Sequence, residues 1–164
     1  MSPVPGRVPQ VLLTERMLGR LATWLRLLGY DTPLIERPPA FPPPGAVLLT
    51  RRQRLAGRPG VLLVAHDRLE DQLRQVLQEL NLRPDPRLRF SRCLRCNLEV
   101  RPLQRQDAAG LVPDYTLATA PAFTRCPGCG QVFWPGSHGA RAEERISALL
   151  ADLPEAASWD SPAT

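Results

Sequence analysis

The chain has 164 residues, of which 43% are hydrophobic, so it can form one ordinary domain with a small appendage. No apolar run approaches the length of a membrane span, and we expect a cytoplasmic protein that does not contact membranes. Its 21 basic residues exceed its 16 acidic ones, and the excess lies mostly in residues 1–90. A basic surface suits a polyanion such as RNA, but all the cations are arginine, and a GC-rich genome explains that composition equally well.

The first predicted elements are a short buried strand over residues 10–15 and an amphipathic helix over residues 16–29. Gly29 is a natural residue to end that helix. At 100° per residue, one face of the helix is apolar and another carries arginines. The apolar face holds Met17, Leu18, Leu21, Trp24, Leu25 and Leu28.

Three further runs, residues 30–36, 46–50 and 60–66, are predicted strands, and a helix with apolar residues from Leu69 to Leu80 follows them. Asp67 and Glu70 have the spacing of a helix cap. Apolar strands that alternate with helices favour an α/β fold, a parallel sheet sandwiched by helices. The proline-rich segment 37–45 cannot form the usual crossover helix, so either the crossover is an extended loop or the strand order differs from the simple pattern.

After a break at residues 83–87 the chain carries two Cys-x-x-Cys pairs, Cys93–Cys96 and Cys126–Cys129, and no other cysteine. Two such turns provide the four thiolates of a structural zinc site. Two disulfides are the alternative, and a thioredoxin-like redox pair is another, but neither pair opens a helix after a strand. We therefore predict two domains, residues 10–88 and a Cys₄ zinc ribbon over residues 89–152 that includes a final helix from about residue 140.

Two blocks of sequence resemble a known family. One is ERMLGRLATWLRLLGYDT with the later LLTRRQRL, and the other is the cysteine module that closes with RCPGCGQVFWPGSH and ERI. Over residues 10–150 they are similar to the Mut-seven C-terminal RNase family, a PIN-like α/β nuclease domain followed by a zinc ribbon. The resemblance implies a ribonuclease that cuts RNA with Mg²⁺ or Mn²⁺ ions held by clustered carboxylates at the carboxyl edge of the sheet.

The acids that the resemblance requires are only partly present. Glu15 stands at the end of the first strand where the family has an aspartate, and Arg52 stands in LLTRR where the family has an acid. Glu15 and Asp67 remain as candidate catalytic residues, although Glu15 could instead stabilise a helix start and Asp67 could be a helix cap. We expect Arg52 to pair with Glu15 and to place a guanidinium in the metal site.

The sequence leaves three functional classes open. Arg16, Arg20 and Arg26 are candidate RNA-phosphate contacts, or simply a solvated helix face. The leading interpretation is a PIN-like ribonuclease with an incomplete active site. Its rivals are an RNA-binding module that has lost catalysis, and an interaction module whose zinc ribbon docks a protein partner. The carboxylates at the sheet edge distinguish the first two classes.

Overall fold

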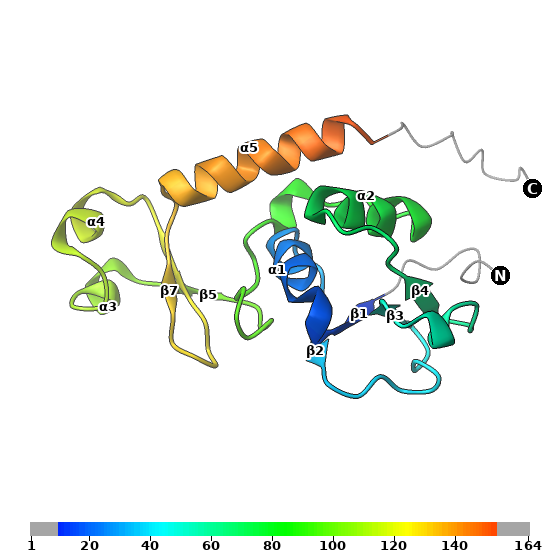
Figure 1. Ribbon diagram of the computed structural model, residues 1–164. Coiled ribbons are helices and arrows are strands. Elements are labelled where there is room, and N and C mark those ends of the chain that lie inside the picture. Colours follow the sequence, from blue (N-terminus) through cyan, green and yellow to red (C-terminus); the bar gives the residue numbers. More distant parts are fainter. Residues whose placement is uncertain (1–9, 154–164) are drawn as a thin grey trace, which may run out of the picture.

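The computed structural model describes residues 10–153, which form an α/β body and a smaller ribbon (Figure 1). The body is built on a four-stranded sheet in which every neighbouring pair is parallel, in the order β2-β1-β3-β4. The α/β class predicted from the alternating apolar segments is confirmed. The strands are β1 (Val11–Glu15), β2 (Leu34–Ile35), β3 (Ala46–Thr50) and β4 (Val61–Leu63).

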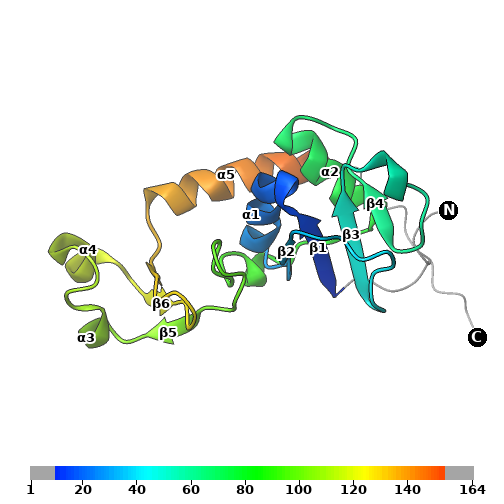
Figure 2. The same cartoon turned by 60° about the horizontal axis from the view of Figure 1, so that its bottom comes forward.

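The helices of the body pack on one face of this sheet (Figures 1 and 2). These helices are α1 (Gly19–Leu27), α2 (Leu69–Glu79) and α5 (Ser137–Ala151). The main core lies between them and the strand residues Leu12, Leu49 and Leu62. This differs from the prediction of helices on both faces, because the segment that would have to supply the second layer is too rich in proline to be helical.

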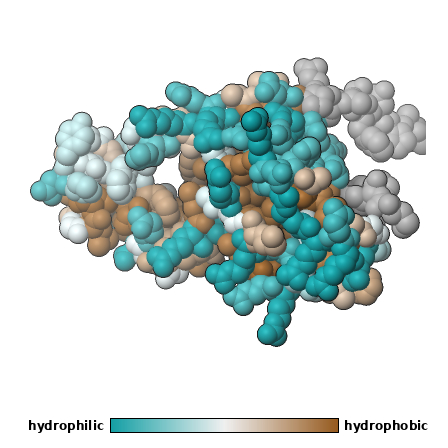
Figure 3. Space-filling model, in the orientation of Figure 1, coloured by the Kyte–Doolittle hydropathy of each residue, from teal (hydrophilic) through white to brown (hydrophobic). Residues whose placement is uncertain are grey.

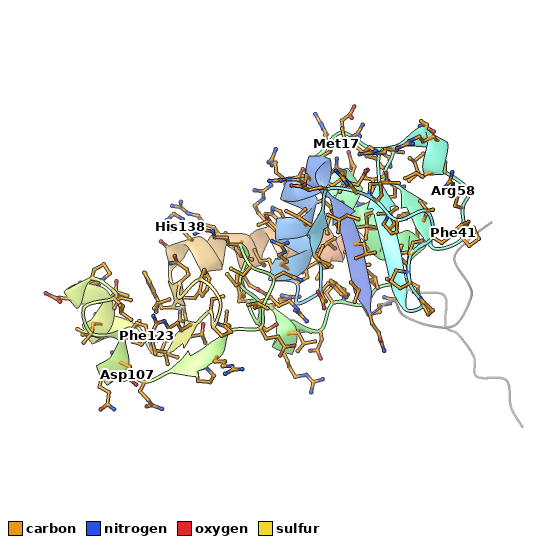
Figure 4. The ribbon with its side chains drawn as sticks, turned by 90° about the horizontal axis from the view of Figure 1, so that it is seen from below. Met17, Phe41, Arg58, Asp107, Phe123 and His138 are labelled. Atoms are coloured by element: carbon orange, nitrogen blue, oxygen red, sulfur yellow. The ribbon has the colours of Figure 1, made fainter. Side chains whose placement is uncertain are left out.

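The proline-rich segment is an extended crossover. It leaves β2 at Ile35 and enters β3 at Ala46, and β1 lies between these two strands. Both alternatives left open by the sequence therefore hold, since the connection is a loop and the strands it joins are not neighbours. Phe41 in this segment is 70% exposed and lies beside Arg58 at one side of the sheet (Figure 4).

The start of the first helix departs from the predicted pattern. Residues Arg16–Leu18 form a 3-10 turn (η1), and the α-helix begins only at Gly19. The tighter turn changes the direction in which side chains point, and Met17 is 73% exposed instead of buried. The predicted end is confirmed: Gly29 adopts φ 97°, and the N–H of Tyr30 donates to the carbonyl of Leu25.

The ribbon is a three-stranded antiparallel sheet in the order β5-β6-β7. Its strands are β5 (Arg101–Leu103), β6 (Phe123–Arg125) and β7 (Val132–Phe133), with the short helices α3 (Arg105–Ala108) and α4 (Asp114–Thr119) between β5 and β6. Phe123 and Val132 are buried in a separate small core with residues of these helices. Two further 3-10 turns occur in the body, η2 (Gln53–Leu55) and η3 (Pro86–Leu88).

Helix α5 follows the ribbon in sequence but packs on the α/β body (Figure 2). Ile146 and Leu149 are buried in the main core. Arg145 pairs with Glu70 of α2, and its guanidinium lies 4.9 Å from the ring centroid of Trp24. The sequence predicts that this helix belongs to the domain of residues 89–152. In the structure it is part of the core of residues 10–88, because its apolar face packs there.

Candidate functional site

The parallel strands bring their carboxyl ends to one edge of the sheet, where the sequence predicts the catalytic acids. Glu15 is the last residue of β1, and Thr50 is the last residue of the neighbouring β3. Met17 marks the same edge in Figure 4, just after β1. Glu15 is only 2% exposed, so its carboxylate is buried and needs partners.

Two groups from the β3 end provide those partners. The hydroxyl of Thr50 donates to Glu15 Oε2 at 2.5 Å, and Arg52 Nε lies 2.6 Å from Glu15 Oε1. The Arg52 contact is an ion pair without good hydrogen-bond direction, so Oε1 accepts no well-aligned hydrogen bond. Thr50 also accepts a hydrogen bond from the backbone N–H of Arg52, which fixes the turn that places the guanidinium. The sequence indicated the pairing of Glu15 with Arg52; it gave no sign of the role of Thr50.

Asp67 does not join Glu15. It follows β4, two strands away from β1 in the sheet order, and its side chain is 91% exposed and paired with Arg51 at 2.7 Å. It is not the helix cap either, because α2 begins after Arg68 with no side-chain capping bond. In residues 10–153, no three His, Asp or Glu side chains bring their ligand atoms within 4.8 Å of one another.

The three candidate phosphate-contacting arginines have different surroundings. Arg16 is exposed and paired with Glu36, whereas Arg20 is exposed without an ion pair in the described chain. Arg26 is 4% exposed, and its guanidinium donates to the carbonyl oxygens of Thr32, Leu94 and Arg95. The prediction that Arg26 contacts phosphate is therefore wrong, because its donors are used inside the protein.

The four cysteines form the second site. Their sulfur atoms all lie within 4.8 Å of one another, and those of Cys93 and Cys129 are 3.8 Å apart. A tetrahedral zinc ion with Zn–S bonds near 2.3 Å requires sulfur–sulfur distances of about 3.8 Å. Backbone N–H groups of Cys96 and Gly128 point to Cys93 Sγ and Cys126 Sγ, each at 3.4 Å. The geometry fits the predicted Cys₄ zinc site, and all four cysteines are free of disulfides.

Hydrogen bonds among the thiols and from the backbone shift the pKa values of the cysteines in opposite directions. Burial opposes ionisation of Cys126, but backbone N–H groups and the thiols of Cys93 and Cys129 outweigh it and lower the pKa of Cys126 to about 7. A hydrogen bond with Cys129 raises the pKa of Cys96 to about 12. Ionisation is thus easiest at Cys126, and a zinc ion held by the four cysteines would supply the positive charge that favours ionisation of the others.

The first cysteine turn is fastened to the α/β body. Besides the bonds from Arg26, the side chain of Asn97 accepts from the backbone N–H of Thr32 and donates to Asp31. Arg92 donates to the carbonyl of Gly29. Asn97 has φ 66°, a left-handed conformation that asparagine tolerates at such turns. Sequence reasoning missed this junction; an Asn directly after Cys-x-x-Cys was the only signal for it.

Comparison with known proteins decides the family. A family model described as the Mut7-C RNAse domain matches residues 10–146, which is most of the chain. The chain belongs to the Mut7-C RNAse domain family. No curated protein and no solved structure matches it. The Mut7-C match spans both the sheet edge and the cysteine cluster, as the sequence resemblance implied. Among the described residues of this Mut7-C chain, no helix combines the length and hydropathy needed to cross a bilayer.

Proposed function

We propose that this chain is a PIN-like Mut7-C protein that binds RNA and has weak or no metal-dependent cleavage, with a zinc ion as a structural element of its ribbon. The observation that carries the proposal is the ion pair of Arg52 with the buried Glu15. A guanidinium placed against this carboxylate takes the position that a divalent ion would need. Arg52 also stands at the position where the family has an acid, so this chain lacks that acid.

Electrostatics explains why an arginine in place of an acid matters for catalysis. Two-metal hydrolysis of a phosphodiester requires ions about 4 Å apart, and several carboxylates must offset their charge. At this edge Glu15 is the buried acid, and Asp67 is engaged with Arg51. A fixed positive charge within a few ångströms repels a cation by several kcal/mol at an effective dielectric constant of about 20. Arg52 therefore lowers the affinity for the ions that the chemistry needs.

The same edge is well suited to a phosphate chain. Arg20, Arg54 and Arg68 are exposed and form no ion pair in the described part of the molecule. Figure 3 shows that hydrophilic side chains cover much of the body in this view. Arginine–phosphate contacts release counterions, so they supply affinity that does not depend on base sequence or on a metal.

A metal-dependent ribonuclease is the second candidate, and one observation favours it. Glu15 Oε1 is buried without a well-aligned hydrogen bond, so it keeps a lone pair that a cation could use. For that to happen the Arg52 side chain, which is 38% exposed, has to move away from the edge. The Arg52 side chain would make this movement when RNA and Mg²⁺ or Mn²⁺ are both present.

The test combines cleavage and binding on the zinc-loaded full chain. We expect a labelled single-stranded RNA to bind without added Mg²⁺ or Mn²⁺, to be released by salt, and to remain intact when Mn²⁺ is added. Arg20→Glu should weaken binding to all sequences alike, whereas Arg141→Glu, an exposed control on α5, should have a smaller effect. Strong Mn²⁺-dependent cleavage that is lost in Glu15→Ala would overturn the proposal, and cleavage that appears only in Arg52→Asp would support it.

A further inference from the structure

The ribbon carries an open hollow of about 490 Å³ beside the predicted zinc site, and two of the four cysteines, Cys126 and Cys129, are among its lining residues. It is formed by β5, the end of β6 and the second cysteine turn, in the part of the molecule that lies away from the sheet in Figures 1 and 2. Arg101 and Arg125 are its charged lining residues, and no acidic side chain lines it.

These two arginines are directly opposite each other in the antiparallel pairing of β5 with β6. Like charges at opposed positions of a ladder destabilise a sheet. Both side chains are exposed, and neither forms an ion pair in residues 10–153. An anion held between them would remove the repulsion, so the pair is more stable with a ligand than without one.

The backbone holds one of the two guanidinium groups in place. Arg125 Nε donates to the carbonyl oxygen of Gly130, and a Cβ at Gly130 would lie 3.3 Å from Arg125 Nη2. Gly130 has φ 76°, a conformation that suits glycine. The absence of a side chain at this position therefore leaves room for the guanidinium beside the second cysteine turn.

Arg101 and Arg125 could instead balance the negative charge of a zinc tetrathiolate. Another arginine, on the buried side of the cluster, is better placed for that role. Arg26 is 4% exposed and lies beside Cys93 and Cys96. Arg26 donates to the backbone between those two cysteines, whereas Arg101 and Arg125 face an open hollow large enough for a ligand.

We propose that this hollow is a second phosphate-binding site, in which Arg101 and Arg125 hold the backbone of single-stranded RNA. The proposal rests on RNA binding as proposed above and extends it from the sheet edge to the ribbon. The hollow lies within the usual size of binding pockets, and its proline side chains, Pro102 and Pro127, give a nucleotide apolar surface beside the two cations. The ribbon would then contribute affinity in addition to its structural role.

The test measures how binding of a fluorescein-labelled oligouridylate to zinc-loaded protein depends on salt. Each phosphate contact on single-stranded nucleic acid contributes about 0.7 to the slope of log K against log salt. The double variant Arg101→Gln with Arg125→Gln should therefore lose about 1.4 from that slope. The matched double variant Arg83→Gln with Arg141→Gln removes the same charge from exposed positions elsewhere, and its slope should change much less.

Each outcome bears on a different proposal. If wild type binds and the ribbon variant binds equally well, the ribbon site is wrong and RNA binding at the sheet edge stands. The ribbon site is also wrong if the salt slope falls equally in both double variants. It is wrong as well if the ribbon variant loses zinc while its RNA binding does not change. Arg101→Glu, at a side chain with no hydrogen bond in the described structure, repeats the test without disturbing the Gly130 contact. If wild type does not bind RNA at low salt, the proposed function itself fails.

Discussion

Arg26 Nη1 lies 2.7 Å from the carbonyl oxygen of Leu94, so a buried side chain of α1 binds the backbone between the first two cysteines. Nε of the same guanidinium donates to Thr32, just after the helix. One side chain thus joins the α/β body to the predicted zinc site. We expect zinc binding and packing of the body to be coupled through this contact, although the two regions are far apart in the sequence.

Replacing this arginine should affect both regions. We expect Arg26→Met to lower the free energy of unfolding by roughly 2–4 kcal/mol, because three carbonyl oxygens lose a charged donor in a buried place. The variant should also bind zinc less tightly, as measured by competition with a chelator. Arg20→Met, on the exposed part of the same helix, should change neither quantity appreciably. Equal zinc affinities in Arg26→Met and wild type would show that the coupling is absent.

The helix end beside this junction is equally sensitive. A Cβ at Gly29 would lie 2.6 Å from the carbonyl oxygen of Leu88, and the residue has φ 97°. Gly29→Ala should therefore destabilise the protein by roughly 2–4 kcal/mol in urea denaturation, from backbone strain and the clash together. Gly19→Ala is the matched control in the same helix, because nothing lies within 4 Å of its Cβ position. The control should be neutral or slightly stabilising.

The cysteine cluster predicts one zinc ion per chain. Protein purified without chelator should contain close to one equivalent by metal analysis, and Cys126→Ser should contain much less. Hydrogen exchange should show loss of protection in β5–β7, with smaller changes in the strands of the body, whose buried core is separate from the small core of the ribbon. Zinc contents below half an equivalent in wild-type protein would count against the site.

The buried carboxylate at the sheet edge provides a test of its own. Thr50→Val keeps the shape of the side chain but removes the hydroxyl that donates to Glu15, and it should cost about 1–3 kcal/mol. In a Glu15→Gln background the same substitution should cost less, because the charged partner is gone. A double-mutant cycle from urea denaturation measures this coupling. A coupling energy of zero would mean that the short contact does not contribute to stability.

The sequence by itself determined the family, the α/β class and the cysteine cluster. These depend on local patterns: apolar runs of strand length, the Cys-x-x-Cys spacing, and a glycine at a helix end. The sequence also indicated that Glu15 and Arg52 would meet, because both stand at carboxyl ends of predicted parallel strands, and such ends lie along one edge.

Only the tertiary structure decided how the remaining groups are used. Arg26 is a candidate phosphate contact when it is placed on an ideal helix, but the turn after Cys93 covers it, and a buried guanidinium must bond to nearby carbonyls. Asp67 is separated from Glu15 by the strand order, which periodicity does not reveal. Helix α5 packs on the body and not on the ribbon because its apolar face is complementary to α1 and α2, a long-range match that no local pattern encodes.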